Sequence, residues 1–430
     1  MNFEMLKNKD FTLLILGKFV SLIGSYMQDF ALALYVLKLT GSSLIFGSVI
    51  TIALIPKIIL SPICGVFADR LDRKKVIVYL DMLSGLFIAV LYVISITVGI
   101  QLVHVYISVI VLSMISTLFQ PSISAAIPSI VKKEELVDAN VFNSTVMTVG
   151  QLIAPIMAGL LYGTFGLSIV LLINSISFIC SSISEMFINI PKLERRDAKF
   201  SFAEFKKDFM EGLSFVKERK KLTKLIGSSL IINIAINPIF SIGLVVIIKT
   251  VIKASDLQFG YMETILVVGT LIAPLLVKPI SRKLNLLQIF VYVLFACGIV
   301  MILMAVNTMD IYLGLFNTNM IPYISFISLC FIIMMSISIY NIVFFTLIQQ
   351  TVPTAKLGRV GSLISTITMA AIPIGQIVFS AMFEYFPKYI PMIIGAIIII
   401  GTAIYVVVSS VEKENQIAIE QAVEEGTSAP

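Results

Sequence analysis

Long apolar runs follow one another along almost the whole of this 430-residue chain. A helix needs about 20 apolar residues to cross the hydrocarbon core of a bilayer, where no water satisfies the backbone. The alternating pattern of a membrane barrel is absent from these runs. We therefore predict an all-α membrane protein with twelve transmembrane helices. The predicted spans lie near residues 12–38, 43–67, 76–98, 103–130, 141–165, 167–190, 223–249, 257–280, 285–306, 321–349, 360–383 and 389–410.

Composition agrees with this prediction. The chain is 58% hydrophobic and only 13% charged, which is far more apolar than a soluble globular protein. The four cysteines lie in or beside apolar runs without metal-ligand spacing, so we expect inert thiols and no metal site. The single histidine, His104, lies near the start of a predicted span, where an interfacial position explains it.

Lys and Arg residues are distributed unevenly between the connections. If the twelve spans alternate in direction, most of the 31 Lys and Arg residues fall in the two terminal tails and in the connections on the same side as the tails. The positive-inside rule makes that side cytoplasmic. We therefore expect a multi-pass protein of the cell membrane with both termini in the cytoplasm. The net charge of +6 follows from this topology and does not indicate a nucleic-acid partner.

The longest polar segment divides the chain in two. It separates an N-terminal six-helix bundle (1–190) from a C-terminal one (223–410), and a cytoplasmic tail follows (411–430). Within the linker, 191–222, Ser201 and Glu204 have capping-box spacing, and apolar residues recur on one helical face. We expect an amphipathic helix along the inner membrane surface, with a solvated linker as the alternative. Its predicted apolar face comprises Phe202, Phe205, Phe209, Leu213 and Val216.

A charged block, "GVFADRLDRKK" (65–75), interrupts the apolar sequence between spans 2 and 3. It resembles the loop between helices 2 and 3 of the major facilitator superfamily and departs from it at Asp72, where the family often has Gly. A weaker copy, "PLLVKPISR", follows span 8, opposite "PICGVFADR", as in a duplicated transporter. The resemblance implies two pseudo-symmetric bundles and a cytoplasmic latch between them, although a positive-inside anchor is the simpler alternative. The predicted gating residues are Gly65, Asp69, Arg70, Arg73 and Arg282.

Span 5 contains the stretch "GQLIAPIMAG". It resembles the Gly-Pro pattern of antiporters in the superfamily, with two glycines replaced by alanine. Small residues four apart also permit close helix packing, so packing explains the pattern about as well as antiport does. The residues concerned are Gly150, Ala154, Pro155 and Gly159.

Three further stretches resemble the macrolide-efflux-like branch of the drug exporters in this superfamily. They are "FQPSISAAIPSIV" (119–131), "KKEELVDANVFN" (132–143) and "LGRVGSL" (357–363). Many proton-coupled members carry an Arg in helix 4, whereas span 4 here has no Lys or Arg. The usual scheme of proton coupling therefore does not transfer directly to this chain.

Ionisable residues within spans are costly unless paired or hydrated, so each is a functional candidate. Asp29 in span 1 and Lys57 in span 2 lie at depths that a lysine stem can bridge, and we expect them to pair. Glu263 in span 8 is a second deep acid that the resemblance places beside the same cavity, although a neighbouring helix could satisfy either acid instead. Lys18 and Glu185 lie nearer the inner surface, where we expect their side chains to snorkel to water.

Polar residues on spans 1, 4, 7 and 10 are predicted to face a central cavity. With 19 Met and 29 Phe in the chain, an adaptable apolar binding surface is a reasonable expectation, but such residues also face lipid in any membrane protein. The polar candidates are Gln28, Gln120, Asn233, Asn237, Tyr340 and Asn341.

No enzyme motif, nucleotide-binding loop or metal cluster is present in the sequence, so we expect neither an enzyme nor a cofactor. The leading prediction is a monomeric secondary transporter that exports hydrophobic or cationic drugs by alternating access, with protons as the coupling partner. One alternative is export or import of an endogenous metabolite such as a siderophore or a lipid-like molecule. The other is a non-transporting membrane receptor or scaffold. Substrate identity cannot be read from the fold.

Overall fold

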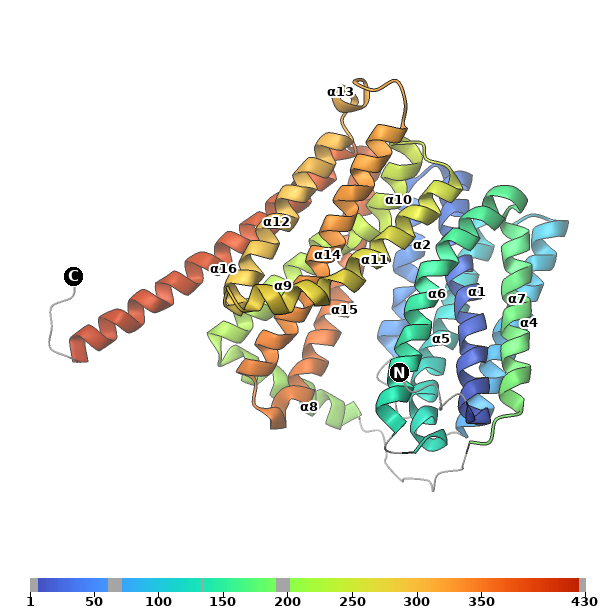
Figure 1. Cartoon of the computed structure of the whole chain (residues 1–430), viewed down its shortest axis with the longest axis horizontal. Helices are drawn as coiled ribbons and strands as arrows, with labels where there is room; N and C mark the ends of the chain where they lie inside the picture. Colours follow the sequence, from blue (N-terminus) through green and yellow to red (C-terminus); the bar gives the residue numbers. More distant parts are fainter. Residues whose placement is uncertain (1–6, 61–71, 133–134, 191–201, 425–430) are drawn as a thin grey trace. The chain divides into compact units, whose positions relative to one another are not determined.

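A computed structural model describes residues 7–60, 72–132, 135–190 and 202–424. Within these residues the regular structure is helical throughout (Figure 1). The elements before the linker are α1 (Lys9–Thr40), α2 (Ser43–Ile52), α4 (Arg73–Thr97), α5 (Leu102–Ile130), α6 (Leu136–Phe165) and α7 (Leu167–Met186). Those after it are α8 (Phe202–Lys217), α9 (Lys220–Pro238), two π-helical segments (Ile239–Gly243 and Ile247–Val251) flanking α10 (Leu244–Val246), α11 (Asp256–Ser281), α12 (Leu286–Asn307), α13 (Asp310–Leu313), α14 (Met320–Thr351), α15 (Thr354–Tyr385) and α16 (Tyr389–Glu424).

In the described residues, twelve helical segments are long and apolar enough to cross a membrane. This confirms the predicted fold class and the number of spans. The first segment, Lys9–Thr40, extends beyond its predicted range at both ends. The second, Ser43–Leu60, approaches residues 61–71, which lie outside the described part of the chain.

The connection between the first two spans shows how local residues end and begin these helices. Gly41 ends α1 with φ of 63°, a left-handed conformation that is strained for residues with a Cβ. Ser42 follows as the N-cap of α2, and its hydroxyl accepts a hydrogen bond from the Ile45 amide at 3.2 Å. Two adjacent residues therefore reverse the chain between spans.

The chain divides into two compact units. The first unit comprises residues 1–206 together with 241–268, and the second comprises 207–240 together with 269–430. The predicted domain limits, at 190 and 223, do not follow this division, because residues 241–268 pack with the helices of the first unit. The two sequence halves as separate bundles stay a prediction.

Each unit has its own apolar core. In the first, Phe11 and Leu14 of α1 pack with Ile77 of α4, Ile123 of α5 and Phe142 of α6. In the second, α12 packs between α14 and α16, and α9 packs against α15. Gly375 of α15 lies so close to the Ile234 carbonyl of α9 that an added Cβ would clash with that backbone.

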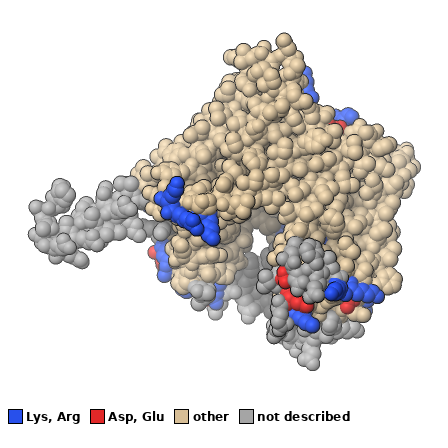
Figure 2. Space-filling model, in the orientation of Figure 1, with Lys and Arg blue, Asp and Glu red and all other residues tan. Residues whose placement is uncertain are grey.

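The surfaces of the spans are apolar. On α4, for example, Leu86, Val90 and Val93 are each more than half exposed. Figure 2 shows a face of the molecule on which Lys, Arg, Asp and Glu side chains occupy a few patches and uncharged residues cover the remaining coloured surface. Such a surface is suited to lipid rather than to water.

Candidate transport site

Asp29 and Lys57 lie in the same unit. Asp29 is on α1 and its side chain is exposed at the surface of the helix, and Lys57 is half-buried on the second span. Lys57 is close enough to act electrostatically on the Asp29 carboxylate. A direct ion pair between them stays a prediction.

An aromatic contact joins the helices that carry Asp29 and Glu263. The rings of Phe30 on α1 and Phe259 on α11 stack with centroids 4.7 Å apart and an interplanar angle of 27°. Asp29 precedes Phe30 in the chain, and Glu263 lies one turn after Phe259 and is half-buried. The structure thus places the two acids on neighbouring helices of the first unit.

The stretch "GQLIAPIMAG" (150–159), which lies in α6, makes close backbone contacts with α11. A Cβ added at Gly260 would lie 2.5 Å from the Pro155 carbonyl oxygen, and one added at Gly159 would lie 2.6 Å from that of Asp256. The Thr264 hydroxyl donates to the Leu152 carbonyl at 2.9 Å across the same contact.

The remaining residues of the stretch also pack closely. Ala154 is fully buried, and a Cβ at Gly150 would lie 2.9 Å from a Leu22 methyl group on α1. Close packing therefore accounts for the small residues in this part of α6. Lys249 adds an ion pair to Asp256 at the start of α11.

Gln28 differs from its predicted orientation toward a cavity. Its side chain is 1% exposed, and its Oε1 accepts a hydrogen bond from Asn174 Nδ2 on α7 at 2.7 Å. Successive residues of a helix point about 100° apart, so Asp29 and Gln28 face different neighbours. The predicted snorkelling of Lys18 is wrong as well, because its side chain is 2% exposed and its Nζ donates to Asn143 Oδ1 at 2.7 Å.

The other predicted polar residues do not form one cluster within either unit. Gln120 on α5 and Asn341 on α14 are exposed. In the second unit, Asn233 Nδ2 donates to the Ser229 carbonyl at 2.9 Å, and Asn237 Oδ1 accepts from Gln376 Nε2 at 3.5 Å. Tyr340 is 3% exposed and packs against other aromatic rings in the second unit.

Most of the predicted gate lies outside the described residues, namely Gly65, Asp69 and Arg70. Arg73 is the first residue of α4, and its Nη1 donates to Ser129 Oγ on α5 at 2.9 Å. Arg282 is exposed just after α11. The predicted latch therefore stays a prediction.

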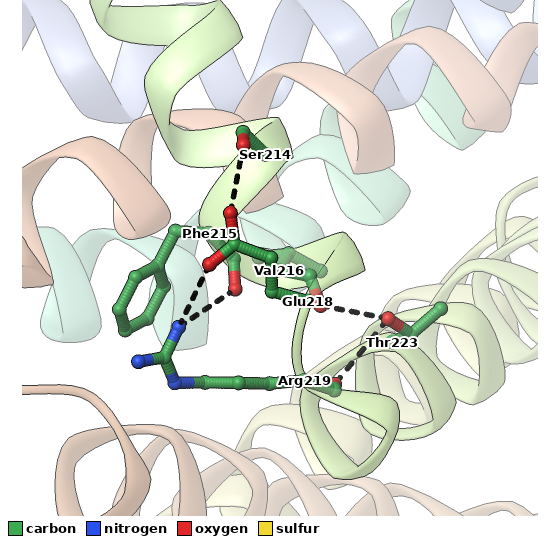
Figure 3. A network of polar contacts seen from close by, with 6 residues as sticks. All are labelled: Ser214, Phe215, Val216, Glu218, Arg219 and Thr223. Carbon is green, nitrogen blue, oxygen red and sulfur yellow. Dashed lines mark hydrogen bonds and ion pairs between the residues drawn. The ribbon is translucent and has the colours of Figure 1, made fainter.

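The linker contains a helix, α8, which docks within the second unit. Phe215 is 4% exposed, and two cations lie over its ring: the Arg219 guanidinium carbon at 3.7 Å and Lys356 Nζ at 4.5 Å from the ring centroid. Figure 3 shows Arg219 folding back toward Phe215 and Glu218. Thr223 Oγ1 donates to the Val216 carbonyl at 2.8 Å, which joins α8 to the start of α9.

α8 also packs against the start of α15. Arg359 forms an ion pair with Glu211, and a Cβ added at Gly212 would lie 3.1 Å from the Arg359 carbonyl oxygen. Part of the face of α8 thus packs on the stretch "LGRVGSL". Attachment of α8 to the membrane surface stays a prediction, and the side chains of its first residues are outside the described set.

An all-helical chain with twelve spans and ionisable residues within them has the architecture of a polytopic membrane transporter. The model of the Major Facilitator Superfamily matches residues 14–376, and the chain belongs to this family.

Known proteins resemble most of the chain or part of it. Macrolide efflux protein A of Streptococcus pyogenes is 25% identical over 373 residues, which cover 85% of this chain and 87% of that protein. The enterobactin exporter EntS of Shigella boydii is 25% identical over 169 residues, covering 39% and 41%. A bacterial homologue of the iron transporter ferroportin in an inward-facing state has the same fold, with a TM-score of 0.69 at 18% identity over 91% of this chain and 98% of that one.

Proposed function

We propose that this chain is a secondary exporter that moves hydrophobic or cationic drugs out of the cell in exchange for protons, with Asp29 as the proton-binding residue. The observation that carries the proposal is an exposed acid on a spanning helix, within electrostatic range of Lys57. An ionised carboxylate at this depth is costly, and a proton or a cationic substrate neutralises it. The similarity to macrolide efflux proteins supports the drug substrate.

The exchange would follow from competition at one carboxylate. A proton on Asp29 removes its attraction to Lys57 and to a cationic substrate, so the two ligands exclude one another. Glu263, on the neighbouring helix, would be a second proton-binding acid beside the same hydrated space. Because the sequence of α5 contains no Lys or Arg, Lys57 would take the part of the basic partner.

The remaining parts of the proposal concern topology. The distribution of Lys and Arg supports cytoplasmic termini. Gly65, Asp69 and Arg70 would act with Arg73 as a latch on that side, and the protein would work as a monomer.

Proton release from acid-loaded everted vesicles tests the proposal. A pH-sensitive dye reports the pH of the vesicle lumen. Lipophilic cations and macrolides are added to vesicles that contain wild type, Asp29→Asn, Lys57→Met or Asp310→Asn. Asp310 begins the short exposed helix α13 and provides the matched control. We expect compound-dependent proton release in wild type and Asp310→Asn, loss in Asp29→Asn and an altered pH dependence in Lys57→Met. Unchanged release in both Asp29→Asn and Lys57→Met contradicts the assignment.

A second candidate function is export of a siderophore or similar metabolite. The similarity to the enterobactin exporter over part of the chain favours it. Adding a catecholate siderophore to the same vesicles separates the two, because only a siderophore exporter would release protons with it and not with the drugs. A receptor or scaffold would give no flux with either and would tolerate neutralisation of Asp29 and Asp69.

A further inference from the structure

Two buried acids, Asp81 and Glu185, lie outside the contacts described so far. Asp81 is in the third turn of α4 and Glu185 is in the last turn of α7, and these two helices pack along one another. Each residue is 1% exposed, so the predicted snorkelling of Glu185 is wrong. Asp81 carries the same sequence signal as Asp29, because it is a single acid within a predicted span (76–98).

The two carboxyl groups meet at one serine. The Ser181 hydroxyl lies 3.4 Å from Glu185 Oε1 and is also within hydrogen-bonding reach of Asp81. The two acids are close enough to interact electrostatically with one another. Their other oxygens, Asp81 Oδ2 and Glu185 Oε2, are buried and have no hydrogen-bond partner in the described part of the chain. Buried polar atoms are normally paired, so these two orphan oxygens indicate a missing ligand.

The charged side chains nearby are engaged elsewhere or lie toward the helix ends. Toward this end of the packed helices they are Lys9, Asp10 and Lys18 on α1, Arg73, Lys74 and Lys75 on α4, and Glu135 and Asp138 at the start of α6. Lys18 donates to Asn143 Oδ1, and Asp10 Oδ1 accepts from the backbone N–H of Asn189 at 2.9 Å. The titratable groups of α5, His104 and Tyr106, are at its opposite end. Within the described residues, no cation forms an ion pair with Asp81 or Glu185.

We propose that Asp81 and Glu185 form a carboxyl pair that holds one proton in common, a proton-binding site inside the first unit and separate from Asp29. Two adjacent ionised carboxylates repel each other in apolar surroundings, and a single proton removes one of the charges. The protonated acid then has an O–H that donates to the other, which satisfies the orphan oxygens. A calcium or magnesium ion requires about six oxygen ligands, more than two carboxyls and one hydroxyl supply. The inference is independent of the proposed drug export.

Infrared spectroscopy of the full-length protein reconstituted in lipid tests the pair, because a protonated carboxyl has a C=O band distinct from that of a carboxylate. The starting variant is Asp29→Asn/Glu263→Gln, which removes the other acids considered above. We expect this variant to show, at neutral pH, a protonated-carboxyl band whose intensity corresponds to one carboxyl group. Adding Asp81→Asn and Glu185→Gln removes that band, whereas adding the control substitution Asp310→Asn preserves it.

Three results would overturn the proposal. The first is a band that is unchanged after both substitutions. The second is a loss of band intensity that corresponds to two carboxyl groups rather than one. The third is a band that develops only after sodium, potassium and divalent ions are removed. The last would assign the site to a metal cation. If the double substitution does not fold, Glu185→Gln alone provides the test, because the glutamine amide replaces the shared proton as donor to Asp81 and the band is again lost. Circular dichroism checks the helical content of each variant.

Discussion

A single methyl group added at Gly260 tests the close contact between α6 and α11. The new Cβ would lie 2.5 Å from the Pro155 carbonyl oxygen, whereas ordinary contacts begin at 3.4 Å, so the two helices must separate by roughly 0.9 Å. The obstacle is backbone and cannot rotate away. Overpacking of this kind costs about 1–3 kcal/mol, and lengthening the 2.9 Å bond from Thr264 to Leu152 adds about 0.5–1.5 kcal/mol. We therefore expect Gly260→Ala to lose about 2–4 kcal/mol of stability.

Thermal unfolding in detergent, followed by loss of helical circular dichroism, measures this loss. Gly227→Ala and Gly401→Ala are matched controls, because an added Cβ at either helical position meets nothing within 4 Å. Alanine has the higher helix propensity by about 1 kcal/mol, so the controls should melt at or slightly above the wild-type temperature. Gly159→Ala, with its 2.6 Å approach to Asp256, should behave like Gly260→Ala. If Gly260→Ala melts together with the controls, the contact between α6 and α11 is not rigid and the expected loss of stability is wrong.

Two further contacts give predictions of different size. Asn174→Leu leaves the buried Gln28 amide without its partner and should cost about 1–3 kcal/mol of stability. Adding Gln28→Leu should restore most of the lost stability, and a double-mutant cycle of melting temperatures measures this. No recovery in the double variant would contradict the pairing. Phe215→Ala should cost about 3–5 kcal/mol and raise hydrogen exchange throughout α8. Glu211→Gln should cost less than about 1 kcal/mol, because its ion pair with Arg359 is about 40% exposed. Equal exchange of α8 in both variants would refute the docking role of Phe215.

The number of spans could be predicted from the sequence because the hydrocarbon core imposes length and polarity on each span separately. Asp29, Lys57 and Glu263 could be identified from the sequence too, because a charge in an apolar run is conspicuous wherever its side chain points. The sequence also indicated a helix in the linker, since apolar residues recur there with helical period. These conclusions depend only on residues close together in the chain.

Only the tertiary structure decided which side chains meet. A span that is apolar on every side has little periodicity to show which face covers a neighbour, so the sequence alone did not place Gln28 against Asn174. The meeting of Asp81 with Glu185 likewise required two helices separated by about a hundred residues to pack at one height. For Phe215, the deciding contact was with Lys356 near the start of a distant helix. The sequence by itself therefore determined the membrane-spanning helices and their unusual charges, and the tertiary structure decided their partners, because partnership depends on helix rotation and packing rather than on local composition.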